Sequence, residues 1–512
     1  MDARLRAVCD LLVPTVREEA GRHEYDGAVQ DLSPDGVRAA LARLDAAAAG
    51  PAPDDPHDAA HLAVFEEALR VRHRRLELHR RDPYPHLANL ELACYERPYA
   101  PAEQRAAARR RHLARWPDAI DAALESLDAV TAPVARALLG TARGLAADVR
   151  PDDGDLGERA LRAHAALVAH LEHAALHGPP RAALGGPALA ALMGSAEGVT
   201  VDLGRLAERA DAERRRLTEL LRDACARVEP GTAPAALLPR LFADHPEPGA
   251  VLAEARSLAR ESIAFTRERH LVPYVDGECE VVLPPPSRRW VTAMMVWNPP
   301  GEPDAPSRYL VTPPDPGWEP ARAEEWLTRY SRTTLPAITV HEVAPGHFAH
   351  GRTLRRLTSP VRRTLHSLTF MEGWAHYAEE VCLEEGFRSG DPRFAVGVAV
   401  EALVRVTRLA CAIGLHTGAM DVEEATARFM SDAHLAREAA AAEARRGTFD
   451  ATYGRYTWGK FALLDLRERA RREPGSTLPA FHATVLALGC PPIGLLDRVL
   501  DTPRRPAGTR GH

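Results

Sequence analysis

Two short motifs in the sequence have the residue types of a zinc hydrolase. His341-Glu342-Val343-Ala344-Pro345-Gly346-His347 is followed further along the chain by Glu372-Gly373-Trp374-Ala375. A histidine next to a glutamate places a metal ligand and a general base on the same helical turn. A carboxylate from a second helix then completes a three-ligand site, whose fourth position holds a water molecule. The two motifs therefore predict a single zinc site with hydrolytic chemistry.

The spacing of the two histidines departs from the usual His-Glu-x-x-His arrangement. His341 and His347 are six residues apart, which in a straight helix would separate them by roughly 240° at 100° per residue. Pro345 removes the amide that would bond the His341 carbonyl, and Gly346 tolerates an irregular backbone. We therefore expect a helix break that turns both imidazoles toward one metal ion. The alternative is a helix that ends at Pro345, with surface histidines beyond it.

Each member of the two motifs has an expected role. His341 and His347 are the nitrogen ligands of a Zn²⁺ ion, and Glu372 is its third ligand, carried by a second helix. Glu342 is adjacent to a ligand in sequence but is aimed at the bound water, so we assign it as the general base and later the proton shuttle.

Three neighbouring residues are additional candidates. His350 follows His347 by three positions and could replace a ligand, although a solvated histidine is the favoured interpretation. His376 follows Glu372 by four positions, where an acidic residue often orients a metal-bound histidine, so an imidazole there is instead expected to face the substrate. Glu379 is the reserve carboxylate.

Two other segments accompany these motifs. One runs from Arg408-Leu409 to Gly414-Leu415-His416, and the other is Tyr456-Thr457-Trp458-Gly459-Lys460. With His-Glu-x-x-Pro-Gly-His and Glu-Gly-Trp-Ala, they resemble the bacterial domain-of-unknown-function family 885 over about residues 270–470. That family is similar in fold to the mostly helical thermostable zinc carboxypeptidases. The resemblance implies a helical metallopeptidase-like fold, and it implies no particular substrate.

Catalysis also needs groups that stabilise a developing oxyanion. The candidates are His416 and Tyr456, with Tyr453 and Lys460 behind them. The role of His416 depends on the family resemblance, because a lone histidine is more often a core or surface residue. Arg405 or Arg408 could anchor a substrate carboxylate through a bidentate pair.

Lysine is almost absent from the chain. Lys460 is the single lysine among the 65 basic residues. Either chance or a need for a compact ammonium group explains its position, and the need could be structural or catalytic.

The overall composition is that of a large soluble enzyme. The chain has 512 residues, of which 46% are hydrophobic and 27% charged, and its formal net charge is −6. This balance lacks the excess of positive charge that is typical of a nucleic-acid-binding protein. Seven scattered cysteines with no C-x-x-C pair argue for a reducing compartment and against a thiolate metal site. The first twenty residues lack the uninterrupted apolar run of a signal peptide, and the sequence nowhere has eighteen apolar residues in a row. We therefore expect no signal peptide and no membrane span, and a cytoplasmic location.

Periodicity along the chain predicts a mainly α fold with a small β-sheet next to the active-site helix. Residues 1–270 are expected to form a helical N-terminal lobe, with an N-capped helix after Ser33 and long helices at 202–228 and 248–270. Residues 271–502 are expected to hold the catalytic lobe. Short β-like runs at 278–283, 290–297 and 308–312 precede its metal helix. Residues 503–512 are predicted to be a flexible tail.

These observations favour a zinc metallopeptidase that cleaves short peptides by means of a metal-activated water. An edge strand beside the metal helix could hold an extended substrate, or it could be a purely structural hairpin. A second hypothesis keeps the metal site but changes the reaction, to amide hydrolysis or another metal-dependent step on a specialised small metabolite. A third is a non-catalytic helical scaffold. The ligand set argues against the third, because a scaffold needs no free glutamate beside an open site.

Overall fold

The chain folds mainly into α-helices, which confirms the predicted fold class. The computed structural model describes residues 2–497, so the predicted tail at 503–512 lies outside the described residues. The first group of helices is α1 (Ala3–Cys9), α2 (Val13–Glu19), α3 (Pro34–Ala48), α4 (Pro56–Arg70), α5 (Tyr84–Ala88), α6 (Ala102–Ala114), α7 (Trp116–Ser126), α8 (Ala132–Gly144) and α9 (Gly154–His177). The second group is α10 (Gly186–Glu197), α11 (Leu203–Val228), α12 (Pro234–Ala243) and α13 (Val251–Glu268).

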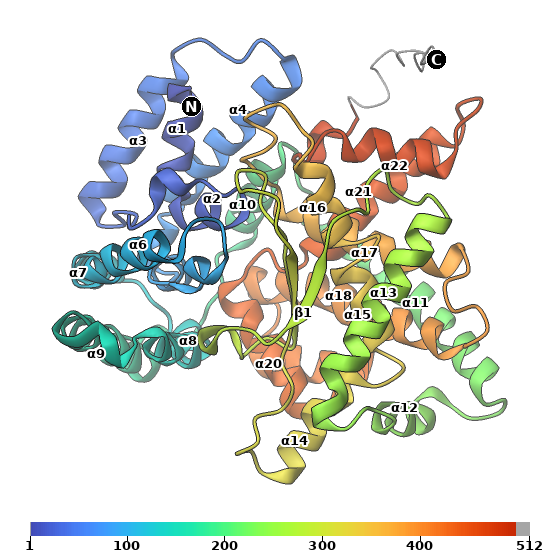
Figure 1. The fold of residues 1–512 in the computed structure, drawn as a ribbon. Coiled ribbons are helices and arrows are strands. Elements are labelled where there is room, and N and C mark those ends of the chain that lie inside the picture. Colours follow the sequence, from blue (N-terminus) through green and yellow to red (C-terminus); the bar gives the residue numbers. More distant parts are fainter. Residues whose placement is uncertain (1, 498–512) are drawn as a thin grey trace.

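The remaining helices follow a small sheet. They are α14 (Pro320–Leu327), α15 (Leu335–Glu342), α16 (His347–Leu354), α17 (Leu368–Glu384), α18 (Arg393–Thr417), α19 (Val422–Ala433), α20 (Arg437–Phe449), α21 (Arg455–Ala470) and α22 (Leu478–Leu486). Figure 1 shows the early helices α1–α9 on one side, with the strands running between them and the later helices. Within residues 2–497, no helix combines the length and the apolar character needed to cross a bilayer.

The long helices begin where the sequence predicts them to begin. Ser33 caps α3 by accepting a hydrogen bond of 3.0 Å from the Gly36 amide, and Asp202 caps α11 by accepting one of 3.0 Å from Arg205. Such caps satisfy amides that have no partner within the helix, which is why serine and aspartate mark helix starts in a sequence.

A three-stranded sheet lies next to the metal-motif helix, as predicted. Its strands are β1 (Cys279–Val282), β2 (Ala293–Val296) and β3 (Ser307–Val311), in the order β1-β3-β2. β3 pairs parallel with β1 and antiparallel with β2, with Met295 opposite Tyr309. β2 is therefore an edge strand, and it packs beside α15.

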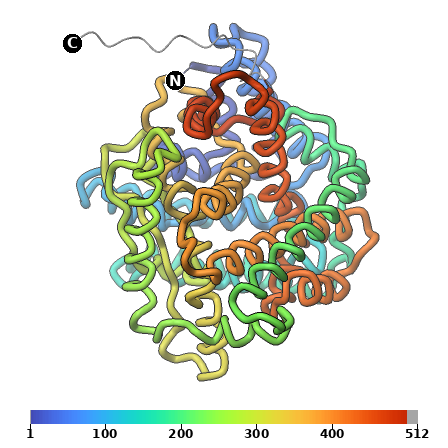
Figure 2. Tube along the Cα trace, turned by 90° about the vertical axis from the view of Figure 1, so that its right-hand side faces the viewer, coloured from blue at the N-terminus to red at the C-terminus, as the bar shows by residue number. Residues whose placement is uncertain are grey.

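Helices from before residue 270 share hydrophobic cores with helices from after it. α11 packs along α18, and Leu217 and Leu221 lie in the same core as Leu403 and Leu409. α13 packs on α15 in a second core. Figure 2, seen from the right-hand side of Figure 1, shows the green, orange and red helices of this part facing the viewer. The two parts are thus closely joined, and the lobe boundary at residue 270 stays a prediction.

Two motif glycines allow α17 and α21 to cross at close range. A Cβ on Gly373 would lie 2.5 Å from the Gly459 backbone, and one on Gly459 would lie 2.0 Å from the Thr369 carbonyl oxygen. Any larger residue at either position would push the two helices apart. The close crossing holds the N-terminal half of α17, which carries Glu372, against the start of α21, which carries Tyr456.

Lys460 is enclosed between α11, α17 and α21. Its side chain is 0% exposed, and its ammonium group contacts Glu213 at 3.0 Å and also Glu380. Lys460 is absent from the lining of the large cavity that contains the metal motifs. A compact ammonium fits this closed space between two carboxylates, whereas a guanidinium is bulkier and planar. The structure thus gives the single lysine a structural position.

We predict that Lys460→Met lowers the free energy of unfolding by about 3 kcal/mol, because Glu213 and Glu380 lose a buried partner. Asp465→Asn is the matched control, since it removes the exposed pair between Asp465 and Arg209 that joins the same α11 and α21. That control should change stability by less than about 1 kcal/mol. Denaturant unfolding measures both. Equal stability of Lys460→Met and the unmodified chain would contradict the structural role.

Candidate metal centre

A break between α15 and α16 brings the two motif histidines together. α15 ends at Glu342 and α16 begins at His347, with a linker in between that includes the cis peptide Ala344–Pro345. At Gly346 a Cβ would lie only 1.9 Å from the His341 carbonyl oxygen, so no other residue fits there. The ring centres of His341 and His347 are 4.8 Å apart. The predicted break is confirmed, and His347 is buried, which excludes the alternative of surface histidines beyond it.

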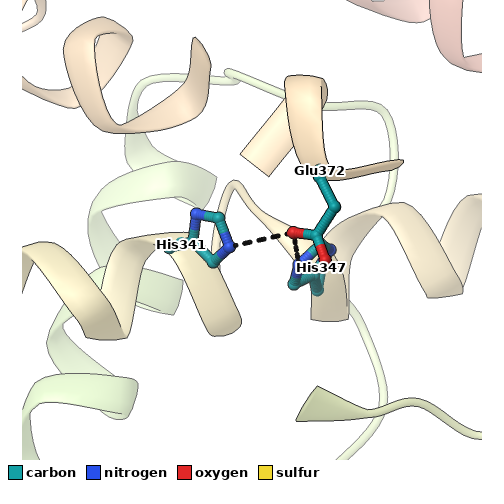
Figure 3. A group of neighbouring side chains, drawn as sticks. All are labelled: His341, His347 and Glu372. Atoms are coloured by element: carbon teal, nitrogen blue, oxygen red, sulfur yellow. Dashed lines mark ion pairs between the residues drawn. The ribbon is translucent and has the colours of Figure 1, made fainter. Parts of the chain in front are cut away.

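Glu372 reaches the two histidines from α17, as Figure 3 shows. Its Oε2 atom lies 3.4 Å from Nε2 of His341 and 3.4 Å from Nε2 of His347. The donor atoms of the three residues all lie within 4.8 Å of one another. In tetrahedral zinc sites with bonds of about 2.0–2.1 Å, neighbouring ligand atoms are about 3.3–3.4 Å apart. The residue types and their spacing therefore fit zinc.

The two motifs are also tied together by a direct hydrogen bond. The Trp374 indole donates to the Pro345 carbonyl oxygen at 2.9 Å, and Trp374 is completely buried. The bond satisfies a carbonyl in the irregular linker, where no helical partner is present. The tryptophan of the second motif therefore fixes the linker of the first.

Glu379 orients His341 from the side opposite to Glu372. His341 Nδ1 donates to Glu379 Oε1 at 2.6 Å, which leaves the lone pair of Nε2 directed toward the other two ligands. Arg405 donates to the other Glu379 oxygen at 3.2 Å. Burial would raise the pKa of Glu379, but Arg405, His376 and His341 lower it overall, so it is ionised. The predicted reserve ligand is thus placed as the partner that fixes the tautomer of His341.

Two other residues take unexpected positions in this network. Arg405, which the sequence suggested as a substrate anchor, instead forms ion pairs with Glu379 at 3.2 Å and with Glu401 at 3.5 Å. His376 contacts Glu379 at 3.3 Å, and burial lowers its pKa to about 4. Its Nε2 has no hydrogen-bond partner among residues 2–497.

Glu342 lies against the edge strand. Its Oε2 accepts a hydrogen bond of 2.7 Å from the Met295 amide of β2. The Met295 amide therefore points away from β3, and in an antiparallel strand the amide and carbonyl of one residue point to the same side. Sequence reasoning did not identify Met295, because a backbone amide leaves no trace in the residue type. The arrangement fixes the carboxylate of the predicted base while leaving it in the cavity.

Tyr456 lies directly beside the ligands. Its ring is stacked on that of His341, with centres 6.2 Å apart and an angle of 25° between the planes. The guanidinium groups of Arg405 and Arg408 are 5.9 and 5.0 Å from the centre of the same ring. The structure thus brings the predicted oxyanion-stabilising candidate to the metal centre.

Two other predicted histidines do not join the cluster. His416 lies eleven residues beyond Arg405 on α18, or about 16 Å along the helix at 1.5 Å per residue. Its Nε2 donates to the Gly447 carbonyl at 2.8 Å, and burial lowers its pKa to about 4. His350 donates to the Gly489 carbonyl at 3.0 Å and is fully buried, so the expectation of a solvated histidine is wrong. Both imidazoles satisfy distant carbonyls.

A large cavity opens onto the metal centre. Its volume is about 2100 Å³, and its lining includes all three ligands, Glu342 and Tyr456. The lining also includes residues of α2, α4 and α8 from the N-terminal part of the chain and the whole of β2. A substrate in this cavity would lie between the N-terminal helices and the ligand-bearing helices.

We predict that Glu379→Gln weakens zinc binding by about 10–100-fold, because the His341 tautomer is no longer fixed by a carboxylate. Glu401→Gln is the matched control, since Glu401 contacts the same Arg405 but not His341. Competition with a chelator measures the zinc dissociation constants of both variants. Equal affinities would show that Glu379 serves only to pair Arg405.

Comparisons with known proteins agree with this architecture. A proposed lipoprotein of unknown function from Shewanella oneidensis has a similar structure, with a TM-score of 0.77, 19% identity and 98% of each chain covered. A proposed lipoprotein from Colwellia psychrerythraea is similar with a TM-score of 0.76 and 15% identity, covering 98% of this chain and 96% of that one. At these identities the likeness concerns the fold. No curated protein matches the chain.

A family model matches a longer part of the chain than the segments that carry the motifs. The model of a family described as "Bacterial protein of unknown function (DUF885)" matches residues 14–500, which includes the helices before the sheet as well as the metal motifs. The chain therefore belongs to the DUF885 family.

Proposed function

We propose that the protein is a zinc-dependent hydrolase, a metallopeptidase acting on short peptides. The observation that carries the proposal is the convergence of His341, His347 and Glu372 beside an unliganded glutamate, Glu342, in a large cavity. Three protein ligands leave a fourth position open in catalytic zinc sites, whereas structural zinc sites are closed by four. A zinc ion bound there would lower the pKa of water to near neutrality and polarise a carbonyl group.

Glu342 is the residue that moves the proton. It follows the ligand His341 directly in the sequence, and the Met295 amide holds one of its oxygens, so the other is free to accept a proton from water. The same carboxyl group can then pass that proton to the leaving amine. Its fixed position supplies the geometry that such a transfer requires.

The edge strand and Tyr456 complete the proposed binding site. The backbone groups of Ala293 and the carbonyl group of Met295 point away from β3, and both residues line the cavity. An extended peptide could pair with them and so lie across the metal centre. Tyr456, whose ring is stacked on that of His341, would donate a hydrogen bond to the oxyanion.

The size of the cavity favours peptides over the second candidate, an amide-containing small metabolite. Sites for small molecules occupy about 300–1000 Å³, whereas this cavity measures about 2100 Å³. A chain of several residues would fill such a space more completely.

We predict that Glu342→Gln retains bound zinc but loses at least about 99% of peptide hydrolysis, because a general base typically contributes 10²–10⁴-fold. Mass spectrometry of a peptide library measures the cleavage. Glu319→Gln, an exposed substitution at the start of α14, is the control and should cleave normally. Full activity in Glu342→Gln would remove this residue as the base.

We predict that the chain, purified without added metal or a histidine tag, contains about one zinc ion per molecule, as a single mononuclear site requires. Glu372→Ala should lose most of this zinc, because one of its three ligands is gone. Elemental mass spectrometry measures the content of both proteins. The absence of metal from the unmodified chain, even after reconstitution with zinc, would favour the scaffold hypothesis.

A further inference from the structure

Four arginines line the cavity close to Tyr456, and we call Arg329, Arg408, Arg446 and Arg455 the arginine cluster. They come from the short helix η9 (Thr328–Tyr330) and from α18, α20 and α21. The Arg408 guanidinium carbon is 5.0 Å from the centre of the Tyr456 ring. Arg446 also interacts with the Tyr456 side chain. Elements that are distant in sequence thus concentrate positive charge in one wall of the cavity.

Two carboxylates form ion pairs with members of the arginine cluster. Glu443 accepts hydrogen bonds of 2.8 and 2.6 Å from Arg408. Asp450 is shared, since it accepts one of 3.2 Å from Arg446 and one of 3.1 Å from Arg455. The cations therefore outnumber their partners, and a buried or half-buried excess charge favours a ligand of opposite sign.

Arg329 is the member of the cluster that remains available. Among residues 2–497, its half-buried guanidinium has no hydrogen bond and no ion pair. It lies close enough to Glu443 to help lower the pKa of that carboxyl to about 2, with Arg408 and Arg446, although burial opposes the shift. Four exposed charged residues that also line the cavity, two basic and two acidic, cancel in sign: Arg322, Glu325, Glu438 and Arg445.

The arginine cluster is within reach of a substrate bound at the metal centre. The Tyr456 ring is 6.2 Å from that of His341 and 5.0 Å from the Arg408 guanidinium. An extended chain advances about 3.3–3.6 Å per residue. A carboxylate in contact with the cluster would thus lie within about three residues of the amide that is cleaved.

We propose that the arginine cluster is a carboxylate-binding subsite, with Arg329 as its free donor. This inference rests on the proposed function for the position of the reacting amide. It names the substrate class as peptides with a carboxylate within about three residues of the cleaved bond. That carboxylate is a free C-terminus or the side chain of an acidic residue. Guanidinium groups suit it because they donate two parallel hydrogen bonds.

The competing anchor is an acidic wall that would bind a substrate amino group. Glu19 and Glu197 also line the cavity, and Glu19 Oε2 has no hydrogen-bond partner among residues 2–497. However, Glu197 is enclosed by bonds from Ser367 and the Ile493 amide, which cap and connect other elements. Glu19 Oε2 also lies 3.7 Å from Nδ1 of His366, so both carboxylates of the acidic wall have a neighbouring group, whereas Arg329 has no ion pair within residues 2–497.

The test uses calorimetry to measure how tightly peptides bind to the zinc-loaded Glu342→Gln protein, which is expected not to hydrolyse them. The first probe is N-acetyl-Ala-Ala-Ala-Leu with a free C-terminal carboxylate, and the second is its C-terminal amide. The third probe is N-acetyl-Ala-Ala-Ala-Glu with a C-terminal amide. The fourth is Ala-Ala-Ala-Leu with a C-terminal amide and a free amino terminus. Arg329→Gln is then added to the protein. Arg437→Gln, which removes an exposed arginine of α20 that pairs with Glu423, is the matched control.

A carboxylate-bearing probe should bind at least about 10-fold more tightly than the second probe, as a charge-assisted bidentate pair allows. Arg329→Gln should abolish this difference, and Arg437→Gln should preserve it. Preference for the first probe alone identifies a C-terminal carboxylate, and equal preference for the third identifies an acidic side chain. Equal binding of the first three probes overturns the proposal. A difference in affinity between the first and second probes that persists in the Arg329→Gln protein also overturns the proposal. Tighter binding of the fourth probe overturns it as well and would favour the acidic wall.

Hydrolysis by the unmodified chain separates this proposal from the proposed function. If the first and second probes are cleaved with the same kcat/KM, the hydrolase stands and the subsite fails. If no probe is cleaved but the carboxylate preference depends on Arg329, the subsite stands and the hydrolase fails. Because the binding comparison needs only the Glu342→Gln protein, a failure of Arg329→Gln to fold would still leave the first comparison decisive.

Discussion

The spacing of seven positions between Glu372 and Glu379 on α17 sets the geometry of the whole site. Seven residues make nearly two helical turns, so both carboxylates project from one face. His341 lies between them, with Nε2 3.4 Å from Glu372 and Nδ1 2.6 Å from Glu379. One carboxylate can share a metal ion with this imidazole, while the other holds its opposite nitrogen. The imidazole can rotate or change tautomer only if one of these contacts is lost.

This arrangement depends on a rigid α17, and the surrounding structure supplies that rigidity. Gly373 and Gly459 let α17 and α21 approach until their backbones touch. Trp374 anchors the irregular linker of the histidine motif through the Pro345 carbonyl. Lys460 joins α17 to α11 through Glu380 and Glu213. Ligands that are held by packed helices lose little freedom when a metal binds, which favours a defined geometry. The motif residues that are not ligands therefore act as the framework for those that are.

Much of this was predictable from the sequence, and the exceptions have physical reasons. The ligands, the helix break at Pro345 and the three strands follow from residue type, spacing and the positions of proline. Contacts between distant segments leave no such local pattern. His350 and His416 bond the carbonyls of Gly489 and Gly447, and neither bond is visible in the spacing of histidines. Likewise, the role of Glu379 depends on the angle at which α15 meets α17, which only the packed structure defines.

The charges around the ligands form the strongest argument for a divalent cation. Arg405 lies between Glu379 and Glu401, so a single guanidinium balances two carboxylates. The half-buried Glu372 carboxylate lies beside two imidazoles, and the Glu342 carboxylate receives one backbone amide. Charge without a partner is destabilising in a protein interior, so this concentration of carboxylates favours the binding of a positive ion at their centre. The proposed Zn²⁺ ion would supply two charges at the point where the nitrogen and oxygen ligands converge. The same ion would draw an amide carbonyl toward Tyr456, and the arginine cluster beyond that ring would then decide which amides can reach it.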